Sequence, residues 1–251
     1  MTGHNTFLTA PGPGRWWVAA GVLIAVAATA AVAGAALAGG TPAGGPAAEA
    51  PPTASSASAS EPAHEDGVVE DPAPGGGPLR LVPAGRRVDD VPVGYPHELA
   101  GAVSAAIEYT TLFSSNLDLD RAVEIGRVMS DGSLGSDQVF RDGAIGLREL
   151  LGAPLSGPVP QGVSATLGIN AYQLRDVSAD RVTVLTLGYM VTSTPVAGTQ
   201  SRLALIPADM VWHDGDWKVT ARPDGAPEYT ELRVQPGSAQ AKAAGWLDFT
   251  Q

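Results

Sequence analysis

The side chains best suited to proton transfer in this sequence are its four histidines, His4, His64, His97 and His213. His213 is the one with acidic neighbours, because Asp214 follows it directly and Asp216 comes two residues later. A histidine beside two carboxylates can bind a metal or act as a general base. Asp214-Gly215, however, is typical of a two-residue hairpin turn, in which the aspartate serves the backbone. The sequence therefore favours a solvated turn at this position.

A second group of polar side chains would face a cavity between predicted helices and strands: Tyr109, Asp142, Tyr172 and Tyr189. Their spacing does not distinguish a lined pocket from ordinary packing. The segment from Asp131 to Asp137 has only a superficial likeness to a calcium loop, since it lacks the D-x-D-x-D-G order and the distal glutamate. We therefore assign no catalytic, cofactor-binding or metal-ligating residue and expect no cofactor. The absence of cysteine excludes disulfides and thiolate metal sites.

Three helices are expected first. Tyr95-Pro96 opens the first, since proline is favoured in the first turn of a helix. Apolar residues then recur mostly at intervals of three and four and predict that this helix ends near Ser115-Asn116. A second helix is predicted over Leu119–Met129 with Asp118 as its N-cap. A third is predicted over Asp137–Leu151, capped by Ser136 and stopped by Gly152 and Pro154.

The apolar period changes to that of strands beyond Pro160. Strands are predicted over 163–177, 181–192 and 201–213, and Pro207 indicates an edge position or a bulge in the last of them. The turn at Asp214-Gly215 then places Trp212 opposite Trp217. This order predicts an α+β fold, a cone-shaped domain of three helices packed on a curved antiparallel sheet of about four strands.

Two segments of this domain resemble the nuclear-transport-factor-2-like, or cystatin-like, fold: residues 93–96 before an Ala-rich helix, and the ending 212–219, Trp-His-Asp-Gly-Asp-Trp-Lys-Val. More narrowly, they are similar to outer domains of membrane-anchored conjugation proteins of Gram-positive bacteria, whose relatives serve type IV secretion. The resemblance covers about residues 90–225. It implies a scaffold subunit without catalysis or cofactor. It assigns no functional role to any residue of this sequence. Conjugation subunits often carry tandem copies of such a domain, whereas one copy is seen here.

The N-terminal part of the chain contains 22 residues without a charge, from Trp16 to Leu37. At about 1.5 Å per residue a helix of this length spans roughly 33 Å, close to the thickness of a bilayer core. We predict one transmembrane helix over 16–38, with Arg15 and the tail 1–15 in the cytoplasm. The alternative is a cleaved signal peptide with Ala36-Leu37-Ala38 as its cleavage site. Under both interpretations, residues 39–251 are exported from the cytoplasm.

Residues 39–90 are rich in Pro, Gly, Ala and Ser and predict a disordered linker. The outer domain is expected over 91–235 and a C-terminal tail over 236–251. Trp246, Leu247 and Phe249 in this tail either dock on the domain or present a partner-binding patch, and the solubility cost of exposed aromatics favours docking.

The expected function follows from this arrangement. A formal net charge of −11 argues against a nucleic-acid surface. We expect a non-enzymatic, membrane-anchored scaffold or assembly subunit at the cell membrane, with its C-terminal domain extracytoplasmic and other envelope proteins or itself as partners. Its setting would be a conjugation or secretion apparatus. The alternatives are a small-ligand-binding or enzymatic domain that uses the cone pocket, and a sensor that signals to the short cytoplasmic tail.

Overall fold

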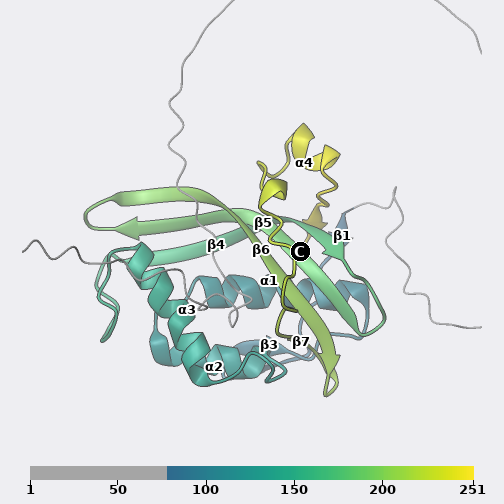
Figure 1. Cartoon of the computed structure of the whole chain (residues 1–251), viewed down its shortest axis with the longest axis horizontal. Coiled ribbons are helices and arrows are strands. Elements are labelled where there is room, and N and C mark those ends of the chain that lie inside the picture. The colour runs from purple at the N-terminus through teal and green to yellow at the C-terminus, as the bar shows by residue number, and fades with distance from the viewer. Residues whose placement is uncertain (1–77) are drawn as a thin grey trace, which may run out of the picture. The chain divides into compact units, whose positions relative to one another are not determined.

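The computed structural model describes residues 78–251 (Figure 1). The predicted cytoplasmic tail 1–15, the predicted transmembrane segment 16–38 and most of the predicted linker lie outside the described residues. The first described strand, β1 (Leu79–Arg80), falls within the range 39–90 that the sequence assigned to the linker. Between residues 78 and 251, no helix combines the length and the apolar content that crossing a bilayer requires.

A four-stranded antiparallel sheet carries most of the long-range pairing. Its strands follow chain order, β4 (Ser164–Arg175), β5 (Arg181–Thr194), β6 (Gly198–His213) and β7 (Asp216–Val219). β7 pairs with the last four residues of β6, so Pro207 lies in a stretch of β6 that, among residues 78–251, pairs with β5 alone. A missing N–H is tolerated at such an edge, and the edge position predicted for Pro207 is confirmed.

Three helices cover one face of this sheet: α1 (Leu99–Ser114), α2 (Leu119–Met129) and α3 (Asp137–Leu150). α2 has the predicted bounds, and the Asp118 carboxylate accepts hydrogen bonds from two backbone N–H groups of its first turn. α1 begins later than predicted, because the Pro96 carbonyl accepts hydrogen bonds from Glu98 N and Trp217 Nε1. Ser136 occupies the N-cap position of α3, but its side chain makes no capping hydrogen bond.

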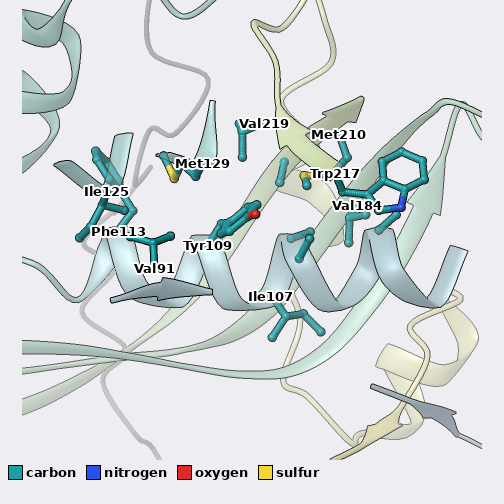
Figure 2. Close-up of a cluster of buried hydrophobic side chains, with 14 of the residues drawn as sticks. Val91, Ile107, Tyr109, Phe113, Ile125, Met129, Val184, Met210, Trp217 and Val219 are labelled. Carbon is teal, nitrogen blue, oxygen red and sulfur yellow. The ribbon is translucent and has the colours of Figure 1, made fainter. Parts of the chain in front are cut away.

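The main core lies between α1 and the sheet (Figure 2). Tyr109 of α1 is fully buried there, among side chains from α2 and from strands β5, β6 and β7. A smaller cluster continues this core toward the β5–β6 turn, where Leu147 of α3 packs with Leu167 and Met190. The helix layer therefore rests on the sheet along most of its length.

The opposite face of the sheet is covered in part by the C-terminal segment, which contains the 3₁₀ helix η1 (Thr230–Leu232), α4 (Ala239–Ala243) and β8 (Phe249–Thr250). The buried Trp246 packs there with Leu185 and Leu187 of β5, and its Nε1 donates a hydrogen bond to the Leu232 carbonyl at 3.0 Å. This second cover explains why seven consecutive residues of β5, 182–188, are buried. The apolar tail docks on the domain, as the sequence favoured.

The fold class predicted from the sequence is wrong as stated. It combined a transmembrane helix with three helices and one sheet, whereas residues 78–251 contain four α-helices and no membrane-spanning one. They also contain two further two-stranded sheets. β2 (Arg86–Val88) pairs with β3 (Val91–Val93) in an antiparallel manner, and β1 pairs with β8 in parallel. Strands of two or three residues are too short to show a hydrophobic period, so the pattern could not predict them.

Candidate functional site

The predicted hairpin turn is present, and it separates the three residues that the sequence grouped as a possible site. Asp214 and Gly215 have positive φ angles of 51° and 77°, as a two-residue hairpin turn requires. His213 Nε2 lies 3.3 Å from Asp214 Oδ2, and both side chains are exposed. Asp216 is buried and is bonded elsewhere. Of the two aspartates, the structure therefore places only Asp214 beside His213, at the surface.

Asp216 is the centre of a buried polar network. Its Oδ1 accepts hydrogen bonds from the backbone N–H groups of Tyr95, at 3.0 Å, and of Trp217, at 2.9 Å. Its Oδ2 accepts one from Lys218 Nζ at 3.0 Å, and the same ammonium donates to the Val128 carbonyl. Its partners within the described residues are two backbone N–H groups and one lysine, and through them this carboxylate joins β7 to α2 and to the segment before α1.

The Asp216 charge also acts on the neighbouring tyrosines. Burial is the main cause that raises the pKa of Tyr109, and the Asp216 carboxylate raises it further. The pKa of Tyr95 is raised in the same way, first by burial and then by the charges of Glu108 and Asp216. Both phenols are therefore protonated at neutral pH and fill space in the core.

The four residues considered for a pocket do not converge. Tyr109 and Tyr172 belong to the packed main core, and Tyr189 is half-buried on β5. Asp142 is exposed on α3, where it accepts a hydrogen bond from Gln138 Nε2 at 2.7 Å. Two of the four thus serve the core, and the other two lie apart from it.

The loop between α2 and α3, which the sequence compared with a calcium loop, is held to the end of β7. Asp131 accepts hydrogen bonds from Ser133 N and from Thr220 Oγ1, at 2.9 and 2.7 Å. Burial by itself raises the pKa of Asp131, but hydrogen bonds from Ser133 and Thr220 and the nearby His213 outweigh it, so the pKa is lowered. Within residues 78–251, no three His, Asp or Glu side chains are grouped so that they could hold a metal ion. These contacts therefore anchor the loop.

An aromatic cluster at the surface was missed by the sequence reasoning. The His97 ring stacks on Trp212 with a centroid distance of 4.1 Å and an interplanar angle of 9°. His97 Nε2 lies 2.9 Å from Asp180 Oδ1 and 3.1 Å from the Ala179 carbonyl. The residues come from the segment just before α1, the β4–β5 turn and β6, so no local spacing signals the cluster. It holds the β4–β5 turn against the helix layer.

A second missed feature is the absence of charge at one end of the sheet. Two long runs of the sequence, 150–174 and 182–201, contain no Asp, Glu, Lys or Arg. The strand register brings parts of both runs together in β4 from 164 to 168, β5 from 189 to 194 and β6 from 198 to 201. We call these residues, with the β5–β6 turn 195–197, the neutral end of the sheet. It lies at the left of Figure 1.

The neutral end exposes apolar side chains. Val196 at the tip of the β5–β6 turn is 99% exposed, and Val191 on β5 is 38% exposed. Tyr189 on β5 is half-buried, and it lies opposite the half-buried Leu203 of β6, which is just outside the neutral end. The C-terminal segment covers the neighbouring Leu185 and Leu187 on this side of the sheet. The neutral end is therefore the less covered continuation of a face that is buried elsewhere.

The fold defines the described part of the chain as a layered α+β domain with a neutral, partly apolar sheet end. The chain belongs to the family described as domain of unknown function DUF8175, whose model matches residues 26–239. The match begins inside the uncharged N-terminal stretch and extends to the start of α4. Neither a curated protein nor a solved structure is significantly similar to the chain.

Proposed function

We propose that this chain is a non-enzymatic scaffold or assembly subunit whose folded domain binds other proteins of the cell envelope through the neutral end of the sheet. The apparatus we propose is one for conjugation or secretion. This setting rests on the resemblance of residues 93–96 and 212–219 to outer domains of conjugation proteins. The proposed location is the outer side of the cell membrane, and it is supported by the uncharged stretch 16–37 that follows Arg15.

The observation that carries the proposal is the composition of the neutral end. The centres of protein–protein interfaces are depleted of charged residues, while the surface of an acidic protein is normally rich in them. Here a chain with a net charge of −11 keeps a whole sheet end free of charge and exposes Val191 and Val196 on it. Exposed apolar groups on such a surface are typical of an interaction site.

The test is site-specific photo-crosslinking in cells that express the full-length chain at its natural level. One variant carries the photoreactive residue at Val196, on the turn at one end of β6, and the matched control carries it at Asp214, on the turn at the other end. The proposal expects Val196 to crosslink to at least one other envelope protein and Asp214 to give no such product. Equal yields from both positions, or no heterologous product from Val196, would contradict it.

A protease-shaving experiment on intact cells tests the proposed location. Cleavage of the folded domain by external protease, with a cytoplasmic marker left intact, is expected. Full protection of the domain in intact cells and cleavage only after lysis would exclude the outer side of the membrane.

A further inference from the structure

The outer edge of β6 at the neutral end has no strand beside it among residues 78–251. From Gly198 to Leu203, β6 pairs on one side with β5, through Thr194↔Gly198 to Tyr189↔Leu203. On the other side, β7 reaches only as far as Met210. Gly198, Thr199, Gln200 and Ser201 are exposed. This edge therefore offers a row of backbone N–H and C=O groups to another strand.

Of the devices that usually block an exposed edge, this segment has neither a proline nor a bulge, and it carries a single charge. Natural edge strands are protected by proline, bulges or charged side chains. The register of β5 with β6 runs without a shift from Arg181↔Val211 to Thr194↔Gly198, and Pro207 lies beyond the exposed part. The one charge, Arg202, donates a hydrogen bond to Gln200 Oε1 at 3.0 Å along its own strand. The segment 198–203 thus has no bulge or proline, and its outer edge is open.

We propose that this edge pairs antiparallel with the same edge of a second copy of the chain, with Ser201 at the two-fold axis. An isologous contact of this kind closes on itself and forms a dimer. The two four-stranded sheets would become one continuous sheet across the interface. The inference deepens the proposed function, on which it rests, by naming a second copy as one partner of the neutral end.

The side chains favour this register over one centred on Arg202. With Ser201 opposite Ser201, each Gln200 stands opposite Arg202 of the second copy, and the hydrogen bond that these two types form within the chain can form between chains. A register centred on Arg202 would instead set two like charges directly opposite each other, which is destabilising. Thr199 stands opposite Leu203 in the proposed register, so each apolar side chain meets a threonine methyl group.

The charge distribution favours a second copy as the occupant. Two chains with a net charge of −11 repel each other, and the repulsion is smallest where neither surface carries a charge. Pairing at the edge of β6 brings one neutral end against the other. A strongly charged partner would find no opposite charge here except Arg202, which is already bonded to Gln200.

Cysteine crosslinking of the full-length chain tests the register, because the natural sequence has no cysteine. Directly opposite residues of an antiparallel pair have Cα atoms about 4.5–5.5 Å apart, within disulfide range. Ser201→Cys should therefore give a disulfide-linked dimer under mild oxidation. The matched control is Thr199→Cys on the same strand. In the proposed register the two thiols at position 199 are separated by four residues along the strands, about 13 Å, and should crosslink at least about tenfold less.

A charge-swap experiment tests the contact without a covalent bond. Ser201→Asp alone and Ser201→Lys alone place like charges at the axis, so light scattering should find each variant monomeric at concentrations where the natural chain is dimeric. A mixture of the two should recover the dimer, because the opposite charges then meet. Recovery in the mixture also shows that both variants are folded.

The outcomes separate this inference from the proposed function. A natural chain that stays monomeric, or crosslinks at position 199 that equal those at 201, would overturn the β6–β6 dimer even if Val196 captures another envelope protein. The predicted crosslinks and charge-swap behaviour would support the β6–β6 dimer. If Val196 gave no heterologous product in the same study, the scaffold proposal would be contradicted while the dimer stood.

Discussion

The carboxylate of Asp216 accepts a hydrogen bond from the backbone N–H of Tyr95, which lies 121 residues earlier in the chain. Lys218 and Trp217 donate to the same carboxylate, so one side chain joins the last hairpin to the segment that precedes α1. The contact is buried, whereas Asp214, two residues away, is exposed on the turn. Two aspartates of one hairpin thus have opposite roles.

This difference gives a stability prediction. Asp216→Ala leaves two buried N–H groups without their acceptor and the Lys218 ammonium without its counter-ion, with only the Val128 carbonyl as acceptor. We expect the free energy of unfolding to fall by about 3 kcal/mol or more. Asp216→Asn keeps an acceptor oxygen, so the free energy of unfolding should fall by less. The control is Asp214→Asn, which should change stability by less than about 0.5 kcal/mol, because asparagine also tolerates a positive φ. Urea denaturation measures all three, and equal losses at 214 and 216 would refute the buried network.

The contact between α2 and α3 gives a second prediction. A Cβ atom at Gly126 would lie 2.2 Å from the ring of Phe140, so Gly126→Ala should force the helices apart and cost about 1–3 kcal/mol. The same substitution at Gly146 of α3 meets no atom within 4 Å. There it should stabilise the helix by about 0.5–1 kcal/mol. Thermal unfolding of the two variants should shift in opposite directions, and a shift in the same direction would be evidence against this packing.

The buried tyrosines predict loss of stability in alkali. Burial raises the pKa of Tyr95 and Tyr109 in the folded state, while an unfolded tyrosine titrates near about pH 10. Above that pH the unfolded chain releases protons that the folded chain retains. Each buried tyrosine should therefore contribute stability that is present below pH 10 and is lost at about 1.4 kcal/mol per pH unit above it.

Tyr109→Phe isolates one of these contributions. Among residues 78–251, no group meets hydrogen-bond geometry with its buried hydroxyl, so the substitution should leave stability at pH 8 unchanged within about 1 kcal/mol. It should also reduce the loss of stability between pH 10 and 11, which denaturant midpoints at each pH measure. The natural chain, measured in the same buffers, supplies the reference for this loss. An unchanged alkaline slope in Tyr109→Phe would mean that this phenol is not buried.

The C-terminal cover of the sheet predicts different effects at two neighbouring residues. Trp246 is 5% exposed and packs on β5, so Trp246→Ala should cost about 3–5 kcal/mol. Leu247 is 41% exposed, and its main contact is the backbone pairing with Tyr172, which a substitution to alanine preserves. Leu247→Ala should cost about 1 kcal/mol or less. Hydrogen exchange of β5 should rise in the tryptophan variant alone; no rise there would indicate that the segment is not part of the core.

The elements that the sequence predicted well are those with local signals. α2 combines an apolar period with the Asp118 cap, and the β6–β7 hairpin has the Asp-Gly turn, so both were placed correctly. The interior polar residues could not be predicted, because their partners are distant in sequence. Arg148 is typical of an exposed helix residue, yet it is 1% exposed and donates hydrogen bonds to the carbonyls of Leu117, Pro154 and Gly157.

The candidate site likewise divides into features with a local sequence signal and features that depend on distant residues. The turn at Asp214 was correctly interpreted as conformational, while the inward position of Asp216 depends on Tyr95 and had no local signal. The neutral end did have one, since the uncharged runs 150–174 and 182–201 are visible in the sequence. Their significance depends on the strand register, which brings them to the same end of the sheet and leaves the edge of β6 open.

The parallel pairing of β1 with β8 has a mechanical consequence. Leu79 N donates to the Asp248 carbonyl and Leu81 N to the Thr250 carbonyl, so the first described strand is held by the last residues of the chain. A pulling force applied at residue 78 would load these two hydrogen bonds in shear before it reached α1. Removal of residues 248–251 would shift the point of attachment inward to Val82, whose N–H donates to Ser104 Oγ on α1.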